Sequence, residues 1–289
     1  MMDYREHHYD SACGQLQLFA RDYRGDGQND RQPLLLMHGL TRNSADFALL
    51  AAHLAGQYRL IVPDQRGRGL SDYDRDPANY RPDVYAADMF ALLASLGIER
   101  AGIIGTSMGG LIAMVMNAMQ PGAFPLIVFN DIGPVLSQEG LDRIKGYVGG
   151  GTVFPDWDAA AKACAAINQS AFPDFGEADW LGWAHRTCRE TVDGIAFAYD
   201  PAIAQGFSED ESQPQPDMWP LWEMLGQTPV LAIRGELSDL LDRDTLAAMQ
   251  ARHLGPFASV EVPRRGHAPL LDEPAALAAI TAFLKDHAQ

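Results

Sequence analysis

Short hydrophobic runs alternate along the chain with longer stretches in which hydrophobic residues recur at helical spacing. Seven runs have the length of strands, at residues 16–20, 33–37, 60–62, 101–104, 126–129, 229–233 and 259–262. The first alternates hydrophobic and polar positions, as an edge strand open to water does, whereas the next four are hydrophobic throughout, as strands buried on both faces are. Helical patterns lie between them, at residues 45–55, 82–96, 108–119, 243–254 and 274–287. This order predicts a mostly parallel sheet covered by helices on both faces.

The alternation breaks once, between residues 134 and 225, where no convincing buried strand is found. Helical patterns at 138–147, 156–166 and 177–189 are followed by a breaker-rich piece at 210–216. All five tryptophans of the chain fall in this segment: Trp157, Trp180, Trp183, Trp219 and Trp222. We interpret it as a helical insertion whose tryptophans form its own core and in part line a ligand pocket beneath it.

Composition narrows the class of protein. Hydrophobic residues make up 47% of the 289 residues, which excludes a disordered chain. The formal net charge of −16 argues against binding nucleic acid or an anionic membrane through a basic surface. We therefore expect neither nucleic acid nor membrane as a partner, and the oligomeric state stays open.

Cysteine usage and the N-terminal residues indicate the compartment. Only Cys13, Cys164 and Cys188 are present, and an odd number cannot form a closed disulfide framework. Residues 1–8 have no hydrophobic run behind their charges, so no secretory signal is predicted. No stretch approaches the roughly 18 hydrophobic residues of a membrane span. These features predict a soluble cytoplasmic protein.

Residues 105–109 fit the pattern G-x-S-x-G and lie between a predicted buried strand and a predicted helix. In a nucleophile elbow the strand turns sharply into a helix and exposes the serine oxygen, and glycines are needed where side chains would collide with neighbours. The helix N-terminus also favours developing negative charge. We predict that Ser107 is a nucleophile rather than a capping serine in a glycine-rich turn.

A serine hydroxyl needs a base, and eight histidines compete for that role. His267 lies in the loop between the last predicted strand and the last helix, and loops at the carboxyl ends of strands are where α/β sheets build their sites. His38 directly follows a strand and precedes Gly39, which indicates a structural role, and His185 falls in the insertion. We predict His267 as the base.

The base needs a carboxylate that orients it. Asp239, in the loop after the strand at 229–233, is flanked by hydrophobic residues, as a carboxylate beneath a histidine would be. Asp131, at the end of the strand at 126–129, is the alternative because that strand end also opens toward the site. We favour Asp239, so the predicted triad is Ser107, Asp239 and His267, one of the known chain orders.

The oxyanion of a tetrahedral intermediate needs hydrogen-bond donors. One is the backbone N–H of Met108, the residue after the nucleophile. The loop after the strand at 33–37 should supply the second, because Gly39 lets the backbone approach the reaction centre. We predict the Leu40 N–H for this role, the alternative being that the loop is only a tight turn.

Together these residues resemble the α/β-hydrolase superfamily over nearly the whole chain. The resemblance rests on the His38-Gly39 turn, the run P-D-Q-R-G-R-G-L-S at residues 63–71, the Ser107 elbow, the Asp239 loop and the Gly266-His267 loop, in that order. In such proteins the P-D-x-R-G-x-G-x-S run is a structural turn, so no catalytic role is carried onto it. The resemblance implies an α/β fold with a mostly parallel eight-stranded twisted sheet, helices on both faces and an inserted helical cap. It divides the chain into a core at 1–133 and 226–289 and a cap at 134–225.

Several branches of the superfamily differ at identifiable residues. Haloalkane dehalogenases and epoxide hydrolases place aspartate at the elbow, and dienelactone hydrolases place cysteine, where this chain has Ser107. Hydrolases of carbon–carbon bonds in aromatic-ring breakdown typically have tryptophan after the histidine, whereas Ala268 and Pro269 follow here. The lipase-type H-G-G-G loop is missing.

We therefore predict a serine esterase acting on a small, largely apolar carboxylic ester or lactone, with no metal or organic cofactor. A nearby arginine, Arg42, Arg143 or Arg186, is available to hold a small carboxylate. The alternatives are a carbon–carbon bond hydrolase or acyltransferase with the same triad, a ligand-binding receptor with vestigial hydrolysis, and cofactor-independent oxygen chemistry.

Overall fold

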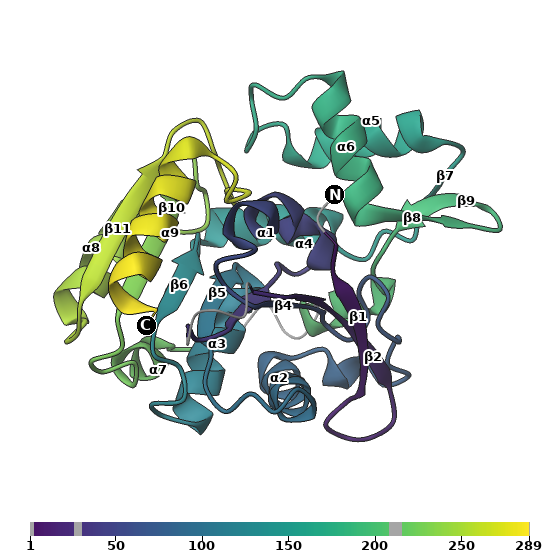
Figure 1. Cartoon of the computed structure of the whole chain (residues 1–289). Helices are drawn as coiled ribbons and strands as arrows, with labels where there is room; N and C mark the ends of the chain where they lie inside the picture. Colours follow the sequence, from purple (N-terminus) through teal and green to yellow (C-terminus); the bar gives the residue numbers. More distant parts are fainter. Residues whose placement is uncertain (1–2, 26–30, 208–215, 289) are drawn as a thin grey trace.

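Eight strands form one sheet in the computed structural model of the chain, which describes residues 3–25, 31–207 and 216–288. They are β1 (Arg5–Asp10), β2 (Gln17–Tyr23), β3 (Leu34–Met37), β4 (Leu60–Asp64), β5 (Gly102–Thr106), β6 (Ile127–Asn130), β10 (Val230–Gly235) and β11 (Phe257–Val262). Their order across the sheet is β1-β2-β4-β3-β5-β6-β10-β11 (Figure 1). The β1–β2 and β2–β4 pairs are antiparallel and the others parallel. The predicted mostly parallel eight-stranded sheet is confirmed.

The hydrophobic pattern did not reveal β1. Its sequence, REHHYD, is polar, and only Tyr9 is buried. The strand forms because its backbone pairs with β2 at the edge of the sheet, and Tyr9 anchors it in the core. One buried side chain among six residues is too few to leave a period-two pattern in the sequence.

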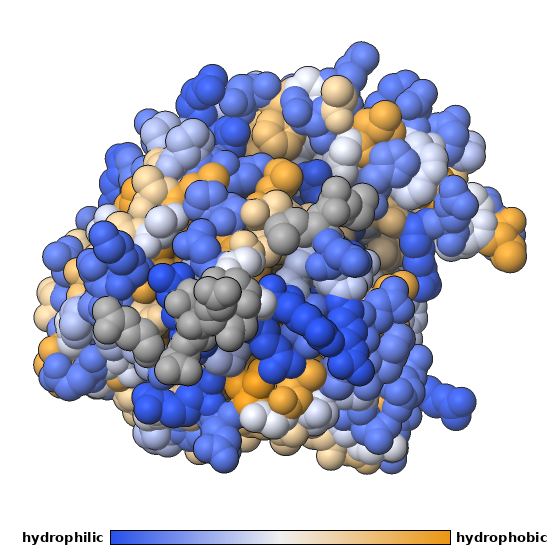
Figure 2. Space-filling view, in the orientation of Figure 1, coloured by the Kyte–Doolittle hydropathy of each residue, from blue (hydrophilic) through white to orange (hydrophobic). Residues whose placement is uncertain are grey.

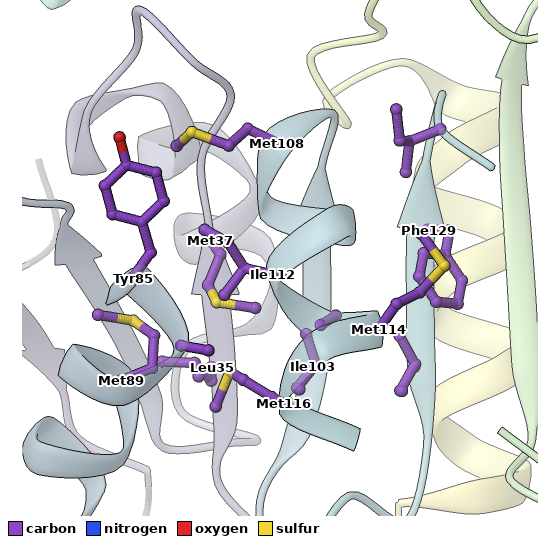
Figure 3. Packing of buried hydrophobic residues seen from close by; sticks show 14 of the residues in the cluster. Leu35, Met37, Tyr85, Met89, Ile103, Met108, Ile112, Met114, Met116 and Phe129 are labelled. Carbon is purple, nitrogen blue, oxygen red and sulfur yellow. The ribbon is translucent and has the colours of Figure 1, made fainter. Parts of the chain in front are cut away.

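Helices cover both faces of the sheet, as predicted. On one face, α1 (Ala48–Leu54) and α9 (Pro274–His287) bury their hydrophobic sides. The other face is covered by α2 (Pro82–Ser95), α3 (Met108–Met119), α7 (Trp219–Glu223) and α8 (Arg243–Arg252). Figure 3 shows this second core, where side chains from α2 and α3 such as Met89 and Met116 fill the space beside Leu35 and Ile103 of the sheet. Each fully buried side chain of this size contributes roughly 1.5–3 kcal/mol.

Most of the chain between β6 and α7 builds a small inserted layer. It contains α4 (Gln138–Tyr147), α5 (Trp157–Asn168) and α6 (Glu177–Thr187), close to the predicted helices. It also contains a three-stranded antiparallel sheet that was not predicted, β7 (Val153–Phe154), β8 (Cys188–Thr191) and β9 (Gly194–Phe197), in the order β7-β9-β8. These strands are short and each has a single buried residue, so no buried hydrophobic run marks them. Apart from Pro216, the breaker-rich piece at 210–216 lies outside the described residues.

Short helical turns also lie between these elements. They are η1 (Ser44–Phe47), η2 (Pro77–Asn79) and η3 (Pro201–Phe207). Figure 1 shows α5, α6 and the β8–β9 hairpin standing apart from the large sheet. The helix α4 packs with the main core through Ile144 and Leu141. This inserted layer has its own hydrophobic cluster, which includes Phe172, Trp180 and Trp183.

The surface seen in Figure 2 is mostly hydrophilic, with separate hydrophobic spots. In the part of the chain that the structure describes, no helix is both long and hydrophobic enough to cross a bilayer.

Candidate active site

Ser107 lies at the turn between β5 and α3 in a backbone conformation that non-glycine residues rarely adopt, with φ 52° and ψ −117°. Such strain persists only where the surrounding structure enforces it, and it is typical of functional sites. Here the turn places the side chain above the end of the sheet, at the N-terminus of a twelve-residue helix.

The glycines beside Ser107 are required by close approach of the backbone. A Cβ atom on Gly105 would lie 2.6 Å from the backbone of Gly109 and Gly110 in α3. A Cβ atom on Gly109 would collide with the carbonyl oxygen of Met37 in β3. The expected collisions with a neighbouring strand and helix are therefore confirmed.

His267 lies in the loop between β11 and α9 and faces Ser107. Its Nε2 atom is 2.7 Å from the Ser107 hydroxyl oxygen, and its Nδ1 atom is 2.8 Å from a carboxylate oxygen of Asp131. The side-chain amide of Asn130 donates to the carbonyl of Pro269 at 2.8 Å and so helps to hold this loop. Hydroxyl, imidazole and carboxylate thus form one continuous hydrogen-bonded chain.

The structure places Asp131, and not Asp239, against the imidazole. Asp131 directly follows β6, is fully buried and has a left-handed backbone with φ 56°. Its two oxygens also accept hydrogen bonds from the backbone N–H of Gly235 at 2.7 Å and the hydroxyl of Ser238 at 2.6 Å. The prediction that Asp239 lies beneath His267 is wrong, and the alternative that the sequence left open is the observed partner.

The carboxylate of Asp239 is instead paired with an arginine of α4. Arg143 forms a two-pronged ion pair with its carboxylate, one of the two bonds being 2.9 Å long. Burial alone would raise the pKa of Asp239, but the hydrogen bond and charge of Arg143 outweigh it and keep the pKa below its ordinary value. The predicted loop still supports the acid, through the hydroxyl of Ser238 rather than the carboxylate next to it.

The loop after β3 is fixed by two side chains on its carbonyl oxygens. His38 donates from Nδ1 to the carbonyl of Gly39 at 2.7 Å, because its Nε2 accepts the backbone N–H of Gln65 at 3.0 Å. Burial lowers the pKa of His38 to about 3, which keeps the ring neutral. Arg68 donates to the carbonyl of Leu40 at 2.9 Å. The structural role predicted for His38 is seen in these contacts.

Two backbone N–H groups remain available next to the serine. Since the carbonyls of Gly39 and Leu40 are directed toward His38 and Arg68, the Leu40 amide between them has a fixed direction. Among the described residues, no acceptor takes the N–H of Leu40 or of Met108. Leu40 also lines the same hollow as Ser107. This arrangement is consistent with the two predicted oxyanion donors, whose role stays a proposal.

The run at residues 63–71 is a structural turn, as the resemblance implied. The Asp64 carboxylate accepts the backbone N–H groups of Ser44 and Leu70. Arg66 forms a buried two-pronged ion pair with Asp88. These contacts are made within the core and hold the loops around the site.

A hollow of about 40 Å³ lies beside the serine. It is lined by Gly39, Leu40, Thr41, Arg42, Asp46, Thr106, Ser107, Ile144, Tyr147, Asn168, His267, Ala268 and Pro269. A second hollow of about 20 Å³ shares four of these residues and is also lined by Trp183 and Phe197. Both the core and the inserted layer therefore contribute walls to the space beside Ser107.

No tryptophan is among the described residues that line the hollow at Ser107. Trp180 lies in the cluster of the inserted layer, and Trp157 packs on His185 with ring centroids 4.1 Å apart. Trp219 lies beneath Arg252, and Trp222 is buried in the core with Phe129. Of the five predicted substrate contacts, only Trp183 adjoins the site, through the second hollow.

A larger hollow, of about 630 Å³, lies at the other end of the sheet. Its lining includes Pro33, Arg59 and Arg100, which precede β3, β4 and β5. Parallel strands carry their sites at their carboxyl ends, so this hollow is remote from the proposed chemistry. No group of three or more His, Cys, Asp or Glu side chains is gathered for a metal within the described residues.

The chain is similar in sequence and in structure to known hydrolases. A family model described as alpha/beta hydrolase fold matches residues 32–274. The chain is 35% identical over 272 residues to the 3-hydroxybutyrate-oligomer hydrolase of Cupriavidus necator, covering 90% of each chain. It is 31% identical to the 2-(acetamidomethylene)succinate hydrolase of Mesorhizobium japonicum, covering 81% of this chain and 79% of that one. The crystal structure of an alpha/beta hydrolase from Novosphingobium aromaticivorans is similar with a TM-score of 0.91, 44% identity and 99% of both chains covered.

Proposed function

The chain belongs to the α/β-hydrolase family, and we propose that this hydrolase cleaves a small carboxylic ester through an acyl-enzyme. The observation that carries the proposal is the hydrogen-bonded chain from Ser107 through His267 to Asp131. Both hydrogen bonds have ordinary lengths. A serine, a histidine and an aspartate in this order can serve as nucleophile, base and orienting acid.

In the proposed mechanism, His267 takes the proton of Ser107 as the hydroxyl attacks the ester carbonyl. Asp131 holds the imidazole in the tautomer with the proton on Nδ1 and stabilises the imidazolium that forms. The N–H groups of Leu40 and Met108 donate to the oxyanion. His267 then returns the proton to the leaving alcohol, and a water activated by the same imidazole releases the acyl group.

The substrate class that best fits is a short hydroxy-acid ester. The hollow is small and partly apolar, with Leu40, Ile144 and Pro269 in its wall. The relative from Cupriavidus necator, 35% identical in an alignment that covers 90% of this chain, is named for hydrolysing 3-hydroxybutyrate oligomers. We therefore propose 3-hydroxybutyrate dimer and trimer as the first substrates to test.

The test combines active-site labelling with turnover. Wild-type protein should react with a fluorophosphonate probe and hydrolyse both p-nitrophenyl esters of short chain length and the 3-hydroxybutyrate dimer. Ser107→Ala should abolish labelling and lower turnover by several orders of magnitude, with little change in fold. Ser95→Ala is the matched control, because Ser95 hydrogen-bonds His7 and the carbonyl of Leu92, away from the site.

Product analysis distinguishes the alternatives that use the same triad. A carboxylic acid and an alcohol in equal amounts support the proposal. Products of carbon–carbon cleavage, or transfer of the acyl group to an acceptor other than water, would reject it. A ligand that raises the melting temperature without being turned over would indicate a binding protein instead.

A further inference from the structure

Arg42 lies in the wall of the hollow that holds Ser107 and His267. Among the described lining residues it is the one with a permanent positive charge, and Asp46 is the one carboxylate. The side chain of Arg42 is only 15% exposed, so its charge acts in a region that excludes much of the solvent. Holding a charge where little solvent reaches it costs free energy, so we expect Arg42 to do more than keep the protein soluble.

Two contacts hold the guanidinium group in one orientation. One nitrogen, Nη1, donates to Asp46 at 2.8 Å, and the guanidinium lies over the ring of Trp183, 3.8 Å from its centroid. Within the described part of the molecule, the remaining N–H groups of the guanidinium have no acceptor. Arg42 is therefore an oriented donor with unused hydrogen-bonding capacity at the site.

A second arginine lies close to this group. Arg186 is three residues beyond Trp183 on α6, and its carbonyl accepts a hydrogen bond from Asn43, next to Arg42. In the described chain its half-buried guanidinium makes neither a hydrogen bond nor an ion pair. Burial lowers the pKa of Arg186. The charge of Arg42 reinforces this effect, and the charges of Asp46, Asp272 and Asp179 oppose it. Within the described residues, both arginines therefore keep hydrogen-bond donors that no acceptor uses.

We propose that Arg42, supported by Arg186, binds a carboxylate of the substrate, so that the enzyme selects short esters that carry a free acid group. The inference rests on the proposed ester hydrolysis and names the part of the substrate that does not react. A planar guanidinium matches a carboxylate with two parallel hydrogen bonds, and such charge-assisted bonds are the strong ones. The net charge of the chain is −16, but at ordinary ionic strength its repulsion of an anion is screened beyond about 10 Å. The nearby arginines therefore have a larger effect on the binding of a carboxylate than the net charge has.

The test compares two esters that differ only in the remote group. They are the mono-p-nitrophenyl ester of succinic acid and the same compound with its free acid converted to a methyl ester. The wild-type enzyme should hydrolyse the free-acid ester with a kcat/KM about tenfold or more above that of the capped ester. Arg42→Gln should lower kcat/KM for the free-acid ester by about 10- to 100-fold, mostly through KM. For the capped ester the change should stay within about threefold, because that ester makes no charged contact to lose.

Further variants separate recognition from folding. Arg42→Lys keeps the charge but not the planar fork and should give an intermediate loss, and Arg186→Gln should give a smaller loss of the same sign. Arg252→Gln is the matched control, because Arg252 also lies over a tryptophan ring, at 4.0 Å from Trp219, and also pairs with a carboxylate, but far from Ser107. An equal loss for both esters in Arg42→Gln would overturn the proposal and assign Arg42 a purely structural role.

A binding measurement keeps this inference separate from the proposed chemistry. Monomethyl succinate should raise the melting temperature of the Ser107→Ala protein, and dimethyl succinate should not. Adding Arg42→Gln should remove that shift. If no ester were hydrolysed but this Arg42-dependent shift were seen, the proposed function would fail and the carboxylate site would stand. If both esters were hydrolysed with equal kcat/KM, the proposed ester hydrolysis would stand and the carboxylate site would be rejected.

Discussion

At the scale of single residues, the role of each carboxylate is set by what it touches. Asp131 and Asp239 both follow strands whose ends meet at the site, and both are near His267. Asp131 is fully buried and accepts three hydrogen bonds, from His267, Gly235 and Ser238. Asp239 is half-exposed and is neutralised by Arg143. A positively charged partner leaves a carboxylate little capacity to stabilise an imidazolium, so only Asp131 is placed for that work.

Exchanging each aspartate for asparagine tests this difference. Asp131→Asn should lower kcat by about 10³- to 10⁴-fold, because the amide no longer fixes the tautomer or stabilises the imidazolium. Asp239→Asn should change kcat less than about tenfold and cost no more than about 1 kcal/mol of stability, as for other partly exposed ion pairs. Steady-state kinetics on one ester, with circular dichroism to confirm folding, makes the comparison. A larger loss for Asp239→Asn would contradict the assignment.

At the scale of elements, the contact between α3 and the strands beneath it creates the strained turn at Ser107. The helix can start only where Gly105 and Gly109 let its backbone touch β5 and β3. On α4 the situation is reversed, since a Cβ atom on the exposed Gly146 would meet nothing within 4 Å. One helix therefore needs glycine for packing, and the other carries it at a cost in chain entropy.

A pair of alanine variants separates these two cases. Gly109→Ala should lower the free energy of unfolding by about 3 kcal/mol or more, because the Met37 carbonyl belongs to a strand that cannot shift freely. Gly146→Ala should raise it by up to about 0.5–1 kcal/mol, because alanine loses less chain entropy than glycine in the exposed last turn of α4. Urea unfolding followed by circular dichroism measures both. A stable, active Gly109→Ala protein would mean that the helix can move away from β3 without loss of the turn.

At the scale of the whole molecule, a buried neutral histidine makes stability depend on pH. His38 is fully buried, and its two ring nitrogens hold the loop that carries Leu40 to the end of β4. Its pKa is about 3 in the folded protein and 6.5 when the ring is exposed. Between these values the unfolded chain binds the proton and the folded chain does not. Stability from this group is therefore complete above pH 6.5 and is lost as the pH falls toward 3.

The variant His38→Asn removes this titration while keeping a donor near the position of Nδ1. The stability difference between wild type and variant should shrink by at most about 1.4 kcal/mol for each pH unit below 6.5. Urea unfolding of both proteins at pH 7.0, 6.0 and 5.0 gives that difference directly and cancels the other groups that titrate. A difference independent of pH would contradict the prediction, because it would mean that the ring binds its proton equally well in the folded and the unfolded chain.

The sequence by itself determined most of the order of strands and helices, the turn at Ser107 and the histidine that faces it, His267. These features depend on local rules: hydrophobic runs mark buried strands, and close backbone approach demands glycine at fixed offsets from the serine. Where the local signal is absent, as in the polar strand β1 or the short strands β7, β8 and β9, the prediction missed the element. There the backbone ladder and the neighbouring strand hold the structure, and neither appears in the pattern of one segment.

Only the tertiary structure decided which aspartate meets the imidazole and which tryptophan adjoins the site. β6 and β10 are neighbours in the sheet, so the loops after them compete for one place, and the choice depends on the left-handed backbone at Asp131 and on Arg143 reaching Asp239 from α4. The same holds for Trp183 and Arg42, which are 141 positions apart in the sequence and stack in space. Partners from distant segments set the energy of a buried charge, and a linear pattern does not contain that information.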